Sequence, residues 1–291
     1  MCMYSSVVKN LCALCYTSLM ELEIVRADPA GNITIFVMNP PEGKDAQAQA
    51  ARALMADPEL KAEQVGFVFP PDEPSGTWKL RMSGDEFCGN ASRSFGLLVA
   101  RLAGISGKAA LTVQVSGASA PLPVRIDTDA QEAEAEVPGP LAVETIFFNG
   151  RHYPLYIFEG ISHAIAADMP PDELFVLDLA RQAQRDFYLP GAFGTMFYDT
   201  RETFMHPVVY VKENGAALPE SSCGSGSAAL ALWAARDLPD ADQRLDIAQP
   251  GGVIKTHLVK KQGQALCLSI GGKVKLGKAV KIPLEILFPT G

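Results

Sequence analysis

Two short segments share a pattern that most narrows what this chain can fold into. Each is a cysteine followed by glycine and then small residues: Cys88 begins CGNASRSFGLL and Cys223 begins CGSGSAALALW. Both continue as apolar runs with helical spacing, so each cysteine stands where a helix is expected to begin. Two helices that start alike predict two similarly built units in one chain.

The elements around the two cysteines repeat in the same order. Helices are expected at 45–57 and 89–102, and again at 171–186 and 224–237. Short runs rich in Val, Ile and Phe predict strands between them. These strands are expected at 33–37, 64–69, 78–82, 111–115, 122–126, 145–148, 153–158, 163–166, 194–198, 208–211, 244–248, 252–259, 265–270 and 273–280. The order predicts an α/β (α+β) fold of two pseudo-symmetric domains, each a curved, mostly antiparallel sheet wrapped around a central helix.

The domain boundaries follow from the repeat. The junction is expected near VPGPLAVE, which gives an N-terminal domain at 20–139 and a C-terminal domain at 140–276, with about 277–291 returning to the first. The first 19 residues contain one basic residue and no clear cleavage site, so they make a poor signal peptide. We expect 1–19 to be a disordered upstream extension, with the fold starting near Met20.

Composition excludes several classes of function. The chain is 48% apolar with a net charge of −8, which is typical of a globular protein and a poor match to nucleic acid or a membrane. Three of its six cysteines lie in the first 19 residues and its four histidines are dispersed, so neither a disulfide framework nor a structural zinc site is expected. A cytoplasmic protein that acts on a small molecule is the favoured interpretation.

The start of a helix can hold two kinds of anion, because its backbone N–H groups are unpaired and carry partial positive charge. One is a thiolate, so we expect lowered pKa values for Cys88 and Cys223, which would make them an acid–base pair. The other is a substrate carboxylate, and glycine after each cysteine would let it approach the backbone. The candidate N–H donors are Gly89, Asn90, Gly224 and Ser225.

These motifs resemble those of the diaminopimelate epimerase and proline racemase superfamily, amino-acid racemases that work without pyridoxal phosphate. AGNITIF (30–36), IAQPGG (247–252) and GGKVKLGKAV (271–280) are also similar to segments of that superfamily. The resemblance spans about 20–280 and implies a diaminopimelate epimerase-like fold with no cofactor. It implies that one thiolate removes the Cα proton while the other thiol protonates the opposite face. Asn32, Asn90 and the helix starts would hold the carboxylate and amine.

The substrate side of the motifs departs from diaminopimelate epimerases. Their Glu-Arg pair before the second cysteine is replaced here by Asn214 and Gly215, and an Asn before the first cysteine is replaced by Lys79. The chain is more similar to the histidine racemases of staphylopine-type metallophore biosynthesis, in MSGDEFCGNA, in ESSCGSG and in EQVGF. This resemblance implies histidine as substrate and makes Glu63, the first residue of EQVGF, the candidate for side-chain recognition.

Other interpretations stay open at this point. The substrate could be another basic amino acid or diaminopimelate, and a phenazine-biosynthesis-like isomerase or a non-catalytic amino-acid-binding protein are the alternatives from other classes. His163 fits a core histidine as well as a site residue, and Cys267 fits a small apolar residue. Glu86 and Glu220 fit either tuning of the thiols or capping of the helices. The sequence also leaves open a homodimer and a disulfide between the two thiols.

Overall fold

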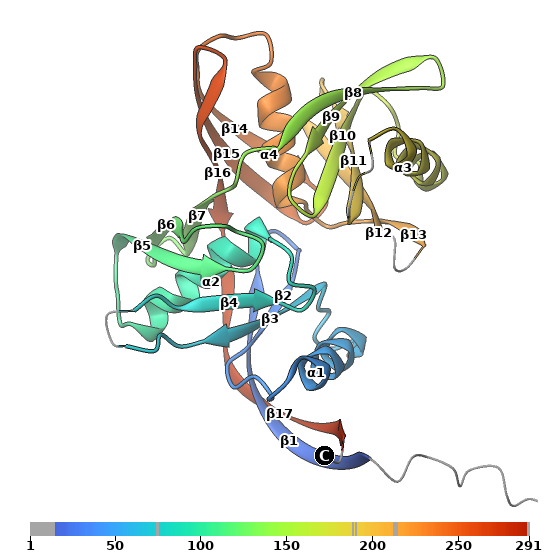
Figure 1. Cartoon of the computed structure of the whole chain (residues 1–291). Coiled ribbons are helices and arrows are strands. Elements are labelled where there is room, and N and C mark those ends of the chain that lie inside the picture. The colour runs from blue at the N-terminus through green and yellow to red at the C-terminus, as the bar shows by residue number, and fades with distance from the viewer. Residues whose placement is uncertain (1–14, 74–75, 188, 190, 212–214, 290–291) are drawn as a thin grey trace, which may run out of the picture.

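The structure, a computed structural model, describes residues 15–73, 76–187, 189, 191–211 and 215–289. Figure 1 shows two lobes, with the N-terminal half of the chain in one and most of the C-terminal half in the other. The helices of the described residues are α1 (Lys44–Ala56), α2 (Gly89–Leu102), α3 (Glu173–Phe187) and α4 (Gly224–Ala234). The mixed α/β class expected from the sequence is confirmed by this element content and by the fold comparisons below.

Strands make up most of the remaining structure. The first half contains β1 (Cys15–Asp28), β2 (Thr34–Val37), β3 (Gln64–Phe69), β4 (Lys79–Met82), β5 (Lys108–Val115), β6 (Leu122–Asp127) and β7 (Glu132–Glu136). The second half contains β8 (Ala142–Phe148), β9 (Arg151–Ile157), β10 (Ile161–Ala167), β11 (Ala192–Asp199), β12 (Phe204–Val211), β13 (Ala216–Pro219), β14 (Ala241–Gln249), β15 (Gly252–Lys261) and β16 (Gln264–Lys273). The last strand is β17 (Lys275–Pro289).

The pairing pattern of the first half recurs in the second. β1 pairs antiparallel with β2, β2 parallel with β3, β3 antiparallel with β4 and β4 parallel with β5, after which β5, β6 and β7 are antiparallel. β9, β10, β11, β12, β14, β15 and β16 follow the same sequence of directions. α1 and α3 connect the first parallel pair of each half, and α2 and α4 the second. The two cysteine-led helices therefore occupy equivalent places.

α2 and α4 lie in the core because small and apolar residues cover more than one of their faces. Phe95 and Leu98 of α2 pack against Val124 and other residues of β5, β6 and β7. Gly96 lets this helix lie close to the sheet, since a Cβ there would collide with Val124. α4 packs in the same way through its alanines. α1 and α3 bury one face only.

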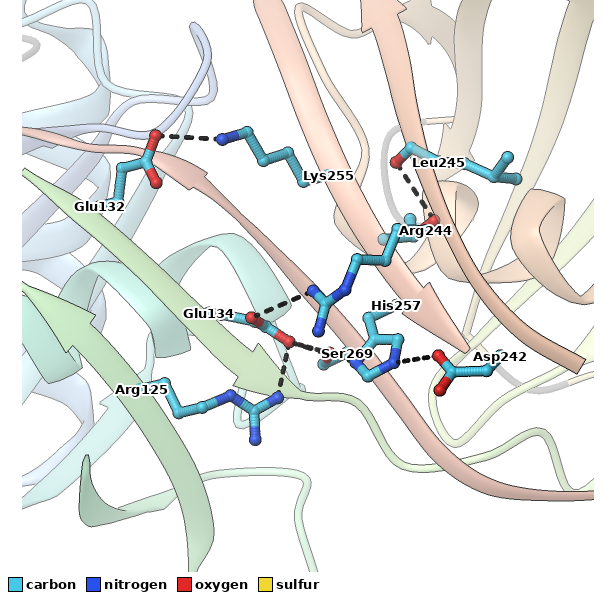
Figure 2. A network of polar contacts seen from close by, with 10 residues as sticks. Arg125, Glu132, Glu134, Asp242, Arg244, Leu245, Lys255, His257 and Ser269 are labelled. Carbon is cyan, nitrogen blue, oxygen red and sulfur yellow. Dashed lines mark hydrogen bonds and ion pairs between the residues drawn. The ribbon is translucent and has the colours of Figure 1, made fainter. Parts of the chain in front are cut away.

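The two halves share one continuous sheet, and α2 and α4 pack against its inner face. β7 of the first half pairs with β16 of the second, so β5, β6, β7, β16, β15 and β14 are joined edge to edge. Figure 2 shows the polar network on its outer face, where Glu134 accepts hydrogen bonds from Arg125 and Ser269, and Arg244 lies 4.0 Å away. Lys255 of the second half pairs with Glu132 of the first at 3.1 Å. Backbone pairing and side chains thus join the halves.

The two ends of the described chain lie together. β1 pairs with β17 from Cys15↔Pro289 to Asp28↔Lys275. β1 therefore begins upstream of Met20, where we expected the fold to start, because its first residues have a partner strand. Residues 1–14 of the expected extension lie outside the described residues. The proposed division at 139/140 stays a prediction. No helix in the described part of the chain is long and apolar enough to span a membrane.

Candidate active site

The starts of α2 and α4 approach each other between the two halves. Gly89 and Gly224 both lie against Ile270 of β16, and a Cβ on either would stand 2.6 Å from the Ile270 Cδ1. A Cβ on Gly224 would also stand 3.4 Å from the backbone nitrogen of Asn90. We expect these glycines to let a ligand approach; the structure gives them a second role, because Ile270 lies so close to each helix start that it leaves no room for a side chain there.

Each cysteine is the N-cap of its helix, as the sequence predicted. The Cys88 Sγ accepts a hydrogen bond from the backbone N–H of Ala91 at 3.3 Å. The backbone N–H of Cys223 donates to the Gln249 Oε1 at 2.8 Å, and its Sγ lies 3.8 Å from the Ser225 Oγ. Both cysteines are free thiols, half-buried at Cys88 and 6% exposed at Cys223. The two sulfurs therefore belong to corresponding positions in the two halves.

The expected lowering of the thiol pKa values is wrong. Burial raises the pKa of Cys88 to about 12, although the Ala91 N–H opposes this, and the charge of Glu86 raises it further. Burial also raises the pKa of Cys223 well above its ordinary value, and Glu220 adds to the effect. Desolvation of a thiolate exceeds the stabilisation that a helix start provides. Both thiols are therefore protonated at neutral pH.

Glu86 and Glu220 act on the thiols rather than as helix caps. The cap positions belong to Cys88 and Cys223 themselves. Each carboxylate lies close enough to its cysteine for its charge to raise the thiol pKa. Of the two alternatives left open by the sequence, the structure favours tuning, in the direction that keeps the proton on sulfur.

Asparagine amides link the two halves beside the helix starts. The Asn32 Nδ2 donates to the Glu63 Oε2 at 2.7 Å. The Asn90 Nδ2 lies 3.4 Å from both the Asn32 Oδ1 and the Ser222 Oγ of the second half. Both asparagines are buried. The sequence-predicted residues Asn32, Glu63 and Asn90 are thus brought together in one hydrogen-bonded row.

The turn that carries Asn32 packs against the Pro-Gly-Gly turn of the second half. Gly31 has φ +83°, and a Cβ there would stand 2.8 Å from the Gly251 Cα and 2.9 Å from the Ser221 Cβ. AGNITIF and IAQPGG, which are far apart in the sequence, therefore meet at the site. Gly31 satisfies a left-handed conformation and a close approach at once.

Two carboxylates give one end of the site a negative character. Burial, together with the charge of Glu63, raises the pKa of Glu220 to about 7. Glu63 itself is exposed, and its backbone N–H donates to the Ile33 carbonyl at 2.9 Å. A cation or N–H donor placed between them would relieve their repulsion.

His163 is a buried residue whose partner belongs to the site. Its Nε2 lies 2.8 Å from the Ser225 Oγ. Burial lowers its pKa to about 3, so the ring is neutral. Gly194 makes room for it, since a Cβ there would stand 2.5 Å from the Nδ1. His163 is a hydrogen-bonded core histidine that orients Ser225, so both interpretations of the sequence hold in part.

Four residues at the site were missed from the sequence. Ser222 contacts Asn90 and Gln249 contacts Cys223, both from the second half, and Gln64 lies close enough to Cys88 to oppose the rise in its thiol pKa. The Arg93 Nε donates a hydrogen bond to the Asn90 Oδ1. Two weak signals were present: Gln249 lies within the IAQPGG segment, and Arg93 is a charged residue in an otherwise uncharged stretch of helix.

Comparisons with known proteins identify the family. The family described as histidine racemase CntK N-terminal domain matches residues 21–280. A histidine racemase of Fusobacterium nucleatum subsp. nucleatum is 34% identical over 270 residues, which are 88% of this chain and 97% of that protein. A histidine racemase of Staphylococcus aureus is 28% identical over 240 residues, 80% of this chain and 87% of that protein.

Solved structures share the fold at low sequence identity. A hydroxyproline epimerase from Agrobacterium vitis, with bound trans-4-hydroxy-L-proline, has a TM-score of 0.63 and 12% identity, with 91% of this chain and 93% of that chain covered. A Bacillus anthracis protein of the PhzF family has a TM-score of 0.62 and 13% identity, with 91% and 99% covered. At these identities the likeness shows the architecture alone.

Proposed function

The chain belongs to the histidine racemase family, and on this basis we propose that it interconverts the L and D forms of histidine without a cofactor. The observation that carries the proposal is the approach of two cysteine-capped helix starts, one from each half, both of which lie against Ile270. Inversion of a stereocentre requires a proton to leave one face and another to arrive at the opposite face. Two opposed thiols supply that pair of groups.

In the proposed mechanism, Cys88 and Cys223 exchange protons with the substrate. One sulfur, as thiolate, takes the Cα proton, and the other gives its own proton to Cα from the opposite side. The first then holds a thiol proton and the second is the thiolate, so charge and atoms balance. A Cα proton is weakly acidic, so hydrogen bonds to the substrate carboxylate must stabilise the developing carbanion. Backbone N–H groups of Gly89, Asn90, Gly224 and Ser225 are the proposed donors.

The raised thiol pKa values make thiolate formation depend on the substrate. A thiolate is disfavoured in the buried site, as described above. The substrate brings an ammonium group, and a positive charge within about 4–6 Å of a thiolate lowers the thiol pKa. We infer that substrate binding, rather than the helix start alone, activates the thiol.

The acidic end of the site supports a substrate with a basic side chain. We propose that Glu63 accepts an N–H of the imidazole, with Asn32 fixing its carboxylate at 2.7 Å. Glu220 adds negative charge nearby. Of the two residues that replace the Glu-Arg pair of diaminopimelate epimerases, Gly215 has no side chain to hold a second amino-acid head, and Asn214 lies outside the described residues.

The decisive experiment follows the Cα hydrogen. Purified protein is incubated with L-histidine in heavy water, with lysine and diaminopimelate in parallel, and deuterium uptake is read by NMR while D-histidine is measured by chiral chromatography. We expect uptake and D-histidine formation with histidine, and loss of racemisation in Cys88→Ser and in Cys223→Ser. Binding without deuterium uptake would indicate an amino-acid-binding protein, and full racemisation by either variant would exclude the two-thiol mechanism.

A further inference from the structure

Arg93 is a buried cation beneath the site that the proposed reaction does not yet use. It is the largest fully buried side chain of the described residues, at 0% exposure. Among the ion pairs of the described residues, no carboxylate pairs with it, and its Nη2 has no hydrogen-bond partner. Burial lowers its pKa to about 10, so it remains charged at neutral pH. A charge held in the core without a counter-ion is costly to the fold, which calls for another role.

Its hydrogen bonds connect the site to the junction of the two halves. The Arg93 Nε donates to the Asn90 Oδ1 at 3.1 Å. The Nη1 donates to the carbonyl oxygens of Gly272 and Lys273 at 3.1 and 3.2 Å. These two residues end β16, where the chain leaves the second half for β17. One guanidinium therefore holds Asn90 in register with the strand that crosses between the halves.

The contact fixes which way the Asn90 amide faces. Arginine has only donors, so it must meet the amide oxygen, and the Asn90 Nδ2 then points toward Asn32 and Ser222. Asn32 in turn accepts through its oxygen and donates to Glu63. The row runs from a buried cation through two amides to a carboxylate, and reversing either amide would place donor against donor or acceptor against acceptor.

The two bonds made by the Asn90 Nδ2 are the weak ones in this row. Both are 3.4 Å long, at the outer limit for a hydrogen bond. The same amide hydrogens are therefore available to a better acceptor, such as a carboxylate oxygen of a bound amino acid. The charge of Arg93 also lies within electrostatic range of Cys88, the N-cap of the same helix.

We propose that Arg93 is a positioning residue of the racemase, which holds the Asn90 amide as a donor toward the substrate carboxylate and keeps a permanent positive charge beneath Cys88. The inference rests on the proposed function for the identity of the ligand. The orientation of Asn90 and the effect on the Cys88 thiol do not depend on it.

The first test compares Arg93→Gln and Arg93→Lys with Arg101→Lys. Arg101 is the matched control, because it lies on the same helix and donates to the carbonyls of Gly277 and Leu276 without reaching the site. The rate at which iodoacetamide alkylates Cys88 is followed against pH by mass spectrometry of the Cys88 peptide, which needs no racemase activity. Because the pKa of Cys88 lies well above this range, the rate between pH 7 and pH 9 reports the small thiolate fraction. We expect that rate to fall by about tenfold in Arg93→Gln, as for a rise of about one unit in the thiol pKa, and to stay unchanged in Arg93→Lys and Arg101→Lys.

The same variants separate the geometric role from the charge. Arg93→Lys keeps the charge and loses the planar fork, so kcat/KM for histidine is expected to fall by about tenfold or more, while Arg101→Lys keeps it. An Arg93→Lys enzyme with full kcat/KM, or an Arg93→Gln alkylation profile equal to that of the parent, would overturn the proposal. The two proposals fail separately: a parent that racemises no histidine counts against the proposed function, whereas an alkylation profile unchanged in Arg93→Gln counts against the role of Arg93.

Asn90→Asp keeps the proposal testable if the Arg93 variants do not fold. An aspartate there would pair with the buried guanidinium and remove the donor, so the melting temperature is expected to rise while racemisation is lost. A purely structural role for Arg93 predicts no such opposite movement of stability and activity. A lowered melting temperature in Asn90→Asp would overturn the assigned contact.

Discussion

Glu220 offers a quantitative check on the electrostatics of the site. It is half-buried next to Cys223, and burial together with the charge of Glu63 raises its pKa to about 7 from an ordinary value of 4.5. A raised carboxyl pKa in the folded state means that the fold favours the neutral acid. Its contribution to stability is therefore fully present below pH 4.5 and is lost as the pH rises through 7.

The size of the effect follows from the separation of the two pKa values. The difference between 7 and 4.5 is 2.5 units, and each unit corresponds to ~1.4 kcal/mol, so ionisation in the fold costs about 3 kcal/mol at alkaline pH. Between pH 5 and pH 8 the loss amounts to about 2.5 kcal/mol, since part of it has occurred by pH 5. Glu220→Gln cannot ionise, so its unfolding free energy relative to the parent is expected to rise by about 2.5 kcal/mol over that range.

The assay is urea unfolding at pH 5, 6, 7 and 8, followed by the fluorescence of the two tryptophans. Glu144→Gln, on the exposed strand β8, is the matched control and is expected to run parallel to the parent. Glu63→Gln removes the neighbouring charge and is expected to shrink the loss. Parallel curves for Glu220→Gln and the parent would refute the assigned burial and coupling.

Two further predictions concern recognition and packing. Glu63→Ala removes the proposed acceptor for the imidazole, so kcat/KM for histidine is expected to fall by about tenfold to a hundredfold. Alanine is the control substrate, and an unchanged ratio of kcat/KM for histidine to kcat/KM for alanine would show that Glu63 does not recognise the imidazole. Gly224→Ala places a Cβ against the Ile270 Cδ1, so it is expected to cost about 1–3 kcal/mol in urea unfolding. Ile270→Val removes that carbon and is expected to recover part of the loss, and a double variant no more stable than Gly224→Ala alone would show that Ile270 is not the obstacle.

Local sequence patterns predicted the helices and strands whose residues have a strong preference for that structure. β3 and α2 have the bounds expected from the sequence, because β-branched and aromatic residues mark one and helical apolar spacing marks the other. β7, with the sequence EAEAE, was missed because Glu and Ala are poor strand formers. Its alternation buries Ala133 and Ala135, and it is a strand because β6 and β16 pair with its two edges. α4 ends at Ala234, short of the expected 237.

The features of the site that depend on local sequence were predictable, and those that depend on distant parts of the chain were not. The two cysteines could be placed at helix starts because capping is local. Their pKa values could not be predicted, since these depend on how deeply the assembled halves bury each thiol. Arg93 was missed for a related reason, because its partners Gly272 and Lys273 come from the far end of the sequence.

The pairing of β1 with β17 bears on the order in which this protein folds during synthesis. β1 is synthesised well before β17, yet most of its length pairs only with β17, and only Ile24 to Ala27 also pair with β2. Contacts between distant parts of a chain form slowly, and an unpaired strand edge invites association with other chains. The second half, whose β9 to β16 lie within one stretch of sequence, can fold before β17 is available to pair with β1. The sheet that contains β1 is therefore the part of the molecule most exposed to aggregation until β17 has been made.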